Sequence, residues 1–328
     1  MLLHALTACG DRGPAEYQLS GPTMGTRFNV TVVVDGDVDL ESLRNKIQAT
    51  LDDADRQMST YRDDSELAGF NRSMSTAWVT VSNELCEAVR LALELGKMTS
   101  GAFDVTVGPL VDLWGFGPDG SVSTPPADDD IELARKNTGL EFLQADCVNT
   151  AIRKTKPGIR IDLSGYGKGR AADDIGILLS EHGIVNFLVE IGGDLRAQGQ
   201  NVKGQPWRIA IEKPDSHGRT VERIIRVDNT AVATSGDYRN FIEYDGQRYS
   251  HTIDPRTGRP VTHNLASVTV VFNNGPFADA YATALMVLGP DAGMALAERL
   301  HIAAYFLVRD GDSLADRMSP AFTMLINP

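Results

Sequence analysis

The segment IDLSGYGKGRAAD (residues 161–173) places Lys168 among glycines and between two aspartates, Asp162 and Asp173. A glycine-rich loop that leads into a helix is typical of phosphate binding, because N–H groups at a helix N-terminus attract anions. A P-loop requires Gly six residues before the lysine and Ser or Thr after it, where Asp162 and Gly169 stand here. The glycines are too closely spaced for a dinucleotide fingerprint. The segment indicates a phosphate ligand of another kind, and a ligand-free strand-to-helix turn is the alternative.

A second segment, YSHTIDPRTGRP (residues 249–260), carries His251 and Asp254 as candidate catalytic groups. Pro255 stiffens the backbone beside them, and Gly258 permits a turn. Loops held rigid in this way commonly present catalytic side chains. The alternative is a well-capped turn without a catalytic role.

A third segment, FADAYATAL (residues 277–285), places Asp279 and Thr283 four residues apart, on one face of an expected helix. Both are oxygen donors, and Mg²⁺ accepts one or two carboxylates while phosphates and water complete its shell. The alternative is an aspartate favoured at a helix N-terminus and a threonine bonded to its own helix. Taken alone, this pair favours the alternative.

The elements that must position these groups are of mixed type. Residues 26–34 alternate as a half-buried strand, and residues 40–58 carry an apolar helical stripe with Asp39 as N-cap. Residues 118–130, with three prolines and a run of acids, predict an exposed connection. Further helices are expected at 82–98, from the glycine-lysine segment to about 182, near 278–288 and 291–300, and further strands within 185–194, 206–214, 268–272 and 303–309. Without a strict βαβ rhythm, we predict an α+β (irregular α/β) fold.

The composition is that of a globular protein, with 42% hydrophobic and 23% charged residues in a chain of 328. The net charge of −13 has the wrong sign for holding a nucleic-acid backbone, so no nucleic-acid partner is expected. A phosphorylated ligand would need local donors, helix ends or a metal. Beyond the N-terminus, no segment reaches the ~18 apolar residues of a membrane span.

The three cysteines are too few for a disulfide scaffold. Cys9 ends the run Leu-Thr-Ala-Cys, which resembles a bacterial lipobox, although only eight residues precede it and none is Lys or Arg. We therefore expect residues 1–20 to be a shortened lipoprotein leader and tether, with a chance cysteine as the alternative. Cys86 falls on the apolar face of helix 82–98 and is expected to be a core thiol. A Cys86–Cys147 disulfide is left open.

Eight motifs along the chain together resemble one known family. They are GPTMGT (21–26), MSTYRDDSELAGFN (58–71), GAFDVTVGPLVDLWGFG (101–117), IDLSGYGKGRAAD (161–173), VEIGGDLRAQG (189–199), AVATSGDY (231–238), YSHTIDPRTGRP (249–260) and ADAYATAL (278–285). In this order they resemble the ApbE family, the FAD:protein FMN transferases, over about residues 20–328. The resemblance implies an ApbE-type single catalytic domain, residues 21–328, with mixed sheets and packed helices.

The resemblance also implies the ligands and the residues that bind them. FAD would be held by Met24, Tyr61, Ala102, Phe103, Asp104, Asp162, Lys168 and Ile253. Mg²⁺ would be held by a main-chain carbonyl at Gly165 and by the side chains of Asp279 and Thr283. For Tyr61, an ordinary core aromatic is the alternative.

The implied reaction moves FMN from FAD to a Thr or Ser hydroxyl of an acceptor protein and releases AMP. His251 is the natural base for that hydroxyl, and Asp254 would hold His251 in place or act itself. Family acceptors carry an Asp-x-x-Thr/Ser-Gly-Ala-Thr/Ser type of motif, and a subunit of a redox membrane complex is the expected partner. The enzyme is expected in the bacterial periplasm, lipid-anchored through Cys9. A metal-dependent FAD pyrophosphatase and a non-catalytic FAD-binding lipoprotein are the alternatives.

Overall fold

A computed structural model describes residues 13–118, 120, 122–214, 220–238, 240–311 and 313–327, and Cys9 lies outside these ranges. In this part of the chain the largest sheet has eight strands, with all neighbouring strands antiparallel. Their order across the sheet is β1 (Ala15–Thr23), β2 (Thr26–Val34), β6 (Asn186–Ile191), β7 (Asp194–Gln198), β10 (Thr230–Gly236), β15 (Leu265–Phe272), β16 (Ala303–Asp310) and β17 (Ser313–Met318).

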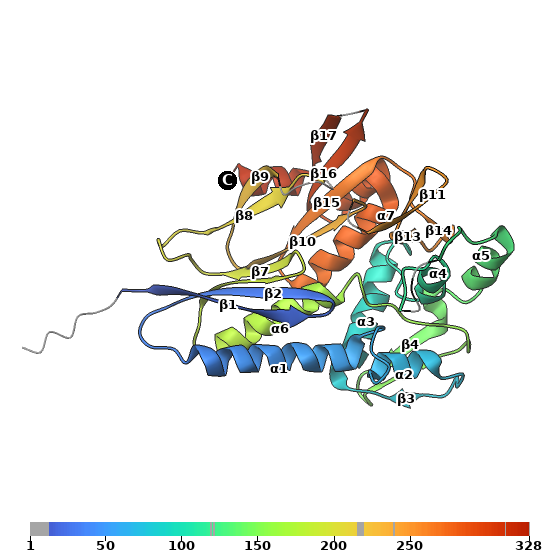
Figure 1. The fold of residues 1–328 in the computed structure, drawn as a ribbon, viewed down its shortest axis with the longest axis horizontal. Helices are drawn as coiled ribbons and strands as arrows, with labels where there is room; N and C mark the ends of the chain where they lie inside the picture. The colour runs from blue at the N-terminus through green and yellow to red at the C-terminus, as the bar shows by residue number, and fades with distance from the viewer. Residues whose placement is uncertain are drawn as a thin grey trace, which may run out of the picture.

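The helices lie mainly around this sheet and at one end of it (Figure 1). They are α1 (Leu40–Met58), α2 (Glu66–Arg72), α3 (Asn83–Met98), α4 (Gly108–Leu113), α5 (Asp128–Arg135), α6 (Gly167–Glu181), α7 (Gly275–Arg299) and α8 (Pro320–Ile326), with a 3₁₀ turn at Leu140–Phe142. Three of the remaining strands form a small sheet in the order β3 (Val79–Thr80), β5 (Ala151–Lys154) and β4 (Leu143–Asp146). The others form three hairpins: β8 (Trp207–Glu212) with β9 (Val221–Val227), β11 (Phe241–Tyr244) with β12 (Gln247–Ser250), and β13 (Ile253–Asp254) with β14 (Arg259–Pro260).

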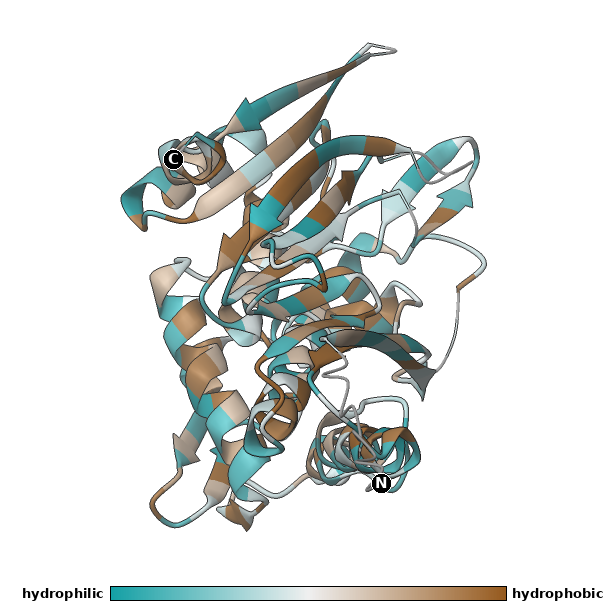
Figure 2. Cartoon of the chain, turned by 90° about the vertical axis from the view of Figure 1, so that its left-hand side faces the viewer, coloured by the Kyte–Doolittle hydropathy of each residue, from teal (hydrophilic) through white to brown (hydrophobic). Residues whose placement is uncertain are grey.

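Both faces of the large sheet are covered, and the alternation along β2 explains why. Val30 and Val32 are buried against α1 and α6, whereas Val33 is buried on the opposite face with the β8–β9 hairpin. Figure 1 shows α1 and α6 on one side of the sheet and β8–β9 on the other. Hydrophobic residues accordingly concentrate on the central strands and on the helix faces packed against them (Figure 2).

Helix α1 forms as the sequence predicts. The Asp39 side chain accepts a hydrogen bond from the N–H of Ser42 at 3.0 Å, which caps the helix start. The predicted stripe is buried along its whole length, at Leu43, Ile47, Leu51, Ala54 and Met58. The expected strand at 26–34 and the helix at 82–98 are also confirmed, as β2 and α3.

Helix α7 is the core helix of the fold. Gly289, with φ of 79°, interrupts its helical backbone just before Pro290, so it consists of two segments, as expected. By length and mean hydropathy it could cross a membrane, but 67% of its apolar window is buried inside the protein. That burial identifies α7 as the interior helix of a globular fold.

The structure bears on two expectations, the domain boundary at residue 20 and the state of Cys86. Strand β1 pairs with β2 from Ala15 onward, so the boundary predicted after residue 20 falls inside a strand and is corrected to before Ala15. Cys86 is buried in the core of α3 and forms a disulfide with Cys147, the alternative that the sequence left open. The predicted α+β class is confirmed, because helices cover an antiparallel sheet.

Candidate active site

A single cleft of about 1160 Å³ gathers nearly all of the predicted site residues. It is lined by Met24, Tyr61, Ala102, Phe103, Asp104, Asp162, Gly165, Lys168, His251, Ile253, Asp279 and Thr283. These residues come from six of the eight motifs. The other two motifs, at residues 189–199 and 231–238, also line the cleft, but with residues that were not predicted. Asp254 is the predicted residue that does not line the cleft.

Glycines bring the two helices at the base of the cleft into contact. A Cβ atom on Gly169 of α6 would lie 2.2 Å from the carbonyl oxygen of Gly275 at the start of α7, so only glycine permits this approach. The contact lets the N–H of Gly169 donate to Oδ2 of Asp279 at 3.1 Å. One turn further along α7, Thr283 packs against Gly165, where a Cβ would lie 2.7 Å from its hydroxyl oxygen. We call Gly165, Lys168, Asp279 and Thr283 the cleft floor, together with Asp194, which binds Lys168 but does not itself line the cleft.

The cleft floor holds two carboxylates and one ammonium group. The Nζ of Lys168 binds a carboxylate oxygen of Asp194 and lies 3.8 Å from Oδ1 of Asp279. Burial alone would lower the pKa of Lys168, but Asp194 and Asp279 raise it above its ordinary value, so the group is charged. Burial and the neighbouring Asp194 raise the pKa of Asp279 from 3.8 to about 7, although Lys168 opposes them. The floor therefore carries an excess of negative charge once Asp279 is ionised, and burial opposes that ionisation.

This floor fits a divalent cation by the chemistry of its donors. A carboxylate, a threonine hydroxyl and a main-chain carbonyl are hard oxygen ligands of the kind that Mg²⁺ accepts. Burial and the neighbouring Asp194 raise the pKa of Asp279, and a bound cation would offset both effects by stabilising the ionised carboxylate. Among the described residues there is no cluster of three or more His, Cys, Asp or Glu suited to a metal, so a site here would depend on hydroxyl, carbonyl and ligand oxygens.

Asp194 is a floor residue that the sequence analysis did not identify. Its side chain is buried, pairs with Lys168, and accepts a hydrogen bond from the N–H of Thr234 at 3.4 Å. It begins β7 directly after the turn at Gly192 and Gly193, both of which have positive φ. The sequence did contain a signal for this residue, because an aspartate directly after a Gly-Gly turn and before an expected strand is a candidate for a buried functional carboxylate.

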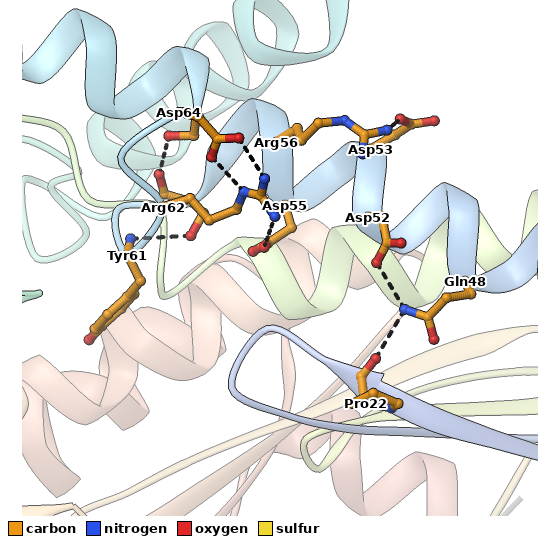
Figure 3. A network of polar contacts seen from close by, with 11 residues as sticks. Pro22, Gln48, Asp52, Asp53, Asp55, Arg56, Tyr61, Arg62 and Asp64 are labelled. Carbon is orange, nitrogen blue, oxygen red and sulfur yellow. Dashed lines mark hydrogen bonds and ion pairs between the residues drawn. The ribbon is translucent and has the colours of Figure 1, made fainter.

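Met24 and Tyr61 reach the cleft from two turns. Met24 and Gly25 form the two-residue turn between β1 and β2, with φ of 45° and 68°, a pair typical of a type I′ hairpin. Tyr61 is 66% exposed, so the alternative of a core aromatic is wrong. Its hydroxyl donates to the carbonyl of Phe116 at 3.0 Å. Figure 3 shows its ring pointing away from the Arg62–Asp64 ion pair in the turn that follows it.

The backbone segments around Asp104 and Asp162 lie side by side. The N–H of Asp162 donates to the carbonyl of Val105 at 2.7 Å, and Val107 forms a parallel bridge with Arg160. The Asp104 carboxylate accepts two hydrogen bonds from Thr106, at 2.6 and 2.7 Å, while burial raises its pKa. These contacts bring the two motifs that carry Asp104 and Asp162 to one wall of the cleft.

His251 lies in the cleft in the tautomer that a base requires. Its Nδ1 lies 2.9 Å from the carbonyl oxygen of Asn240, which only accepts, so Nδ1 carries the proton and Nε2 is free to accept one. Burial lowers the pKa of His251 despite the opposing Asn240 contact. The ring also meets Phe116 edge to face, with centroids 6.3 Å apart. We call Tyr61, Phe116 and His251 the cleft rim.

The structure separates Asp254 from His251. Both carboxylate oxygens of Asp254 accept hydrogen bonds from the Arg256 guanidinium at 2.8 Å, and its carbonyl closes the turn to Gly258. The expected contact that would hold His251 in place comes from Asn240 instead. Asp254 therefore shapes the β13–β14 hairpin, which carries Ile253 at the cleft, and does not orient the imidazole.

Known proteins resemble this chain in both sequence and fold. The model of the ApbE family matches residues 24–306. The FAD:protein FMN transferase of Vibrio cholerae serotype O1 is 44% identical over 323 residues, covering 98% of this chain and 96% of that protein. The protein of that name from Escherichia coli K12 is 41% identical, over 93% and 87% of the two chains.

Solved structures agree with the sequence comparison. The flavin transferase ApbE from Vibrio cholerae superposes with a TM-score of 0.88 at 42% identity, covering 95% of this chain and 99% of that one. The apo form of Pseudomonas stutzeri flavinyl transferase ApbE gives 0.88 at 40% identity, covering 96% and 98%. Matches of this extent in sequence and fold show that the chain belongs to the ApbE family.

Proposed function

We propose that this enzyme transfers the FMN half of FAD to a Thr or Ser hydroxyl of an acceptor protein, releases AMP, and requires Mg²⁺. Transfer of flavin from FAD to a protein is the activity in the names of its relatives. The observation that carries the finer assignment is one cleft that contains a free imidazole nitrogen, a charged lysine and a buried carboxylate with an adjacent hydroxyl. That set matches what breaking a diphosphate requires.

The proposed reaction replaces the phosphoanhydride bond of FAD with a phosphoester bond to the acceptor. The acceptor hydroxyl oxygen attacks the phosphorus atom of the FMN half, and its proton passes to Nε2 of His251. The bond between this phosphorus and the bridging oxygen breaks, and AMP leaves with that oxygen. Lys168, held in place by Asp194, neutralises charge on the diphosphate. Tyr61 and Met24 hold FAD at the open side of the cleft, and Asp104 and Asp162 hold it at the adjoining wall.

Mg²⁺ held by the Gly165 carbonyl, Asp279 and Thr283 would supply positive charge to the diphosphate oxygens. Asp194 and Lys168 keep the Asp279 carboxylate at the floor through their shared contacts. The N–H of Gly169 binds Oδ2 of Asp279, and Oδ1 lies 3.8 Å from Nζ of Lys168, so the carboxylate is held in place from both sides.

The test is mass spectrometry of a synthetic peptide with the pattern Asp-x-x-Thr-Gly-Ala-Thr after incubation with the enzyme, FAD and Mg²⁺. We expect a gain of one FMN on a threonine of the peptide and an equal amount of AMP. Release of AMP and FMN without any peptide would indicate a pyrophosphatase. FAD that stays intact after prolonged incubation would indicate a binding protein, and either result would contradict the proposal.

We also propose that the enzyme works in the bacterial periplasm, tethered to the membrane by a lipid on Cys9. The Cys86–Cys147 disulfide supports an oxidising compartment, because structural disulfides are rare where thiols are kept reduced. The test is incorporation of labelled palmitate into the chain expressed behind a complete lipoprotein leader, with Cys9→Ser as control. Equal labelling of both proteins, or none, would contradict the tether.

A further inference from the structure

One wall of the cleft is formed by a strand edge that the reaction described above does not use. Five consecutive residues of β8, from Arg208 to Glu212, line the cleft. Ile209 and Ile211 are buried, whereas Arg208 and Ala210 are exposed, so the lining residues belong to both faces of the strand. It is therefore the backbone edge of β8, not one of its faces, that borders the cleft.

The main-chain groups of this edge point into open space. The N–H of Lys213 donates to the carbonyl of Thr220 across the hairpin at 2.8 Å. Successive residues of an antiparallel strand direct their N–H and C=O groups alternately toward and away from the partner. The register shift between Ile211 and Glu212 places the extra residue, Glu222, in β9, so the alternation along β8 is unbroken and Arg208 and Ala210 direct theirs away from β9 and toward the cleft. Within the described ranges, no strand pairs with this edge of β8.

The edge is held rigidly before any partner arrives. Trp207, Ile209 and Ile211 are buried against the large sheet. The indole N–H of Trp207 also donates to the carbonyl of Gln198 at 2.9 Å, which fixes the start of the strand beside β7. A preformed edge with open main-chain groups is the feature that strand addition uses in peptide recognition.

The edge and the cleft floor belong to one continuous cleft. Thr234 lines the same cleft, and its N–H contacts Asp194, which in turn binds Lys168. Arg27 and Arg208 are exposed on this wall, and neither forms an ion pair with a described carboxylate. Glu190 and Glu212 line the same cleft, but both have partners of their own, whereas the two arginines remain open to an acidic side chain of a bound segment.

We propose that the acceptor protein presents its hydroxyl on an extended segment that pairs with the free edge of β8 as a third strand. The inference rests on the proposed function, because only a protein acceptor needs such a surface. Main-chain pairing holds the segment with little demand on most of its side chains, while the hydroxyl is delivered to the floor.

Backbone methylation of the acceptor peptide tests this pairing directly. In the Asp-x-x-Thr-Gly-Ala-Thr peptide, methyl groups are placed on successive backbone nitrogens, one peptide at a time. Because alternate residues of an added strand face β8, we expect methylation at one alternate set to reduce kcat/KM about 10-fold per position and at the other set to change it less than about 2-fold. Uniform losses, or no losses, would overturn the pairing. A parent peptide that is not modified at all would instead contradict the proposed function.

A pair of enzyme variants tests the same edge from the other side. Ala210→Pro removes an N–H that faces the cleft, and Arg226→Pro removes one from the outer edge of β9, since Arg208 lies opposite Arg226 in the register. We expect Ala210→Pro to raise KM for the peptide about 10-fold and to leave KM for FAD unchanged. Arg226→Pro should change neither constant. Equal effects of the two variants on the peptide would contradict the proposal.

Discussion

The cleft floor and the cleft rim are built from different parts of the fold. The floor residues lie on or next to α6, α7 and β7, and Asp194 and Asp279 are almost fully buried. The rim residues lie on connections between elements, and Tyr61 is 66% exposed. Charges dominate the floor, whereas aromatic rings and one imidazole dominate the rim.

This difference assigns different tasks to the two regions. Buried charges on packed helices are fixed before a ligand arrives, so they suit the stabilisation of charge on a reacting group. Exposed rings on loops can adjust to a ligand and suit binding. A substitution in the floor should therefore change the rate while binding persists, and a substitution of the rim ring should change affinity while the fold persists.

The largest effect is expected at Asp279. Asp279→Asn removes the carboxylate of the expected cation site, and we predict that transfer falls about 10³-fold or more. The raised pKa of Asp279 means that its ionisation opposes folding as the pH rises above 3.8, the ordinary value. The variant should therefore unfold at an equal or higher temperature than the wild type at pH 7 to 8.

Thermal unfolding with and without Mg²⁺, in the presence of FAD, gives a readout apart from activity. Mg²⁺ should raise the Tm of the wild type and leave that of Asp279→Asn unchanged. An equal rise in both proteins would show that the cation binds elsewhere.

The next effect is expected at His251, the rim residue that takes part in chemistry. His251→Ala should slow transfer by about 10²–10⁴-fold with FAD affinity nearly unchanged, the range for loss of a general base. Asp254→Ala is the control within the same loop, because Asp254 bonds to Arg256 and not to the imidazole. Single-turnover transfer should be slowed far less in that control, and equal losses would return Asp254 to a direct role.

The pH dependence of transfer follows from the burial of His251. Burial lowers its pKa below the ordinary 6.5, so the imidazole stays neutral at neutral pH. At saturating Mg²⁺, which would keep Asp279 ionised, the wild-type rate should therefore be constant from pH 8 down to about 6.5 and decline only below it, and His251→Ala should lack this decline. A half-maximal rate above pH 6.5 would contradict the assignment.

Local sequence patterns predicted single elements and the residues on them better than they predicted contacts between motifs. Helical spacing placed Asp279 and Thr283 on one face of a helix, and α1 was placed correctly because such spacing is local, but only the family resemblance named the pair as metal ligands. Asp194 was missed because its role depends on its ion pair with Lys168, which forms only when β7 lies beside α6 in the fold. Asp254 was grouped with His251 by nearness in the chain, and the hairpin turns its carboxylate toward Arg256. Such pairings between elements are not encoded in any short pattern.

A smaller effect is expected at Tyr61. Tyr61→Ala should weaken FAD binding by about 1–3 kcal/mol, the usual contribution of a stacked ring. Because the side chain is exposed, the free energy of unfolding should change by less than about 0.5 kcal/mol. Tyr61→Phe keeps the ring and loses only the bond to the Phe116 carbonyl, so it should retain most of the affinity. Fluorescence titration with FAD measures all three proteins, and unchanged affinity in Tyr61→Ala would exclude stacking.

The last prediction compares two glycines of the loop that leads into α6, one of which should tolerate substitution. A Cβ on Gly169 would lie 2.2 Å from the carbonyl oxygen of Gly275, whereas a Cβ on Gly167 would meet nothing within 4 Å. Gly169→Ala should therefore force α6 and α7 apart and lower the free energy of unfolding by about 1–3 kcal/mol. Gly167→Ala, at the first position of the helix, should stabilise the protein by up to about 1 kcal/mol.

The two alanine variants also decide what the glycines of this loop are for. If their main task is to let the helices touch, Gly169→Ala should lose transfer activity because Asp279 moves away from Lys168, and Gly167→Ala should keep it. If their main task is to leave room for a diphosphate against the backbone, Gly167→Ala should weaken FAD binding although its folded state is unstrained. Urea unfolding and FAD titration of both variants distinguish these outcomes, and we expect the first because the helix contact is the closer one.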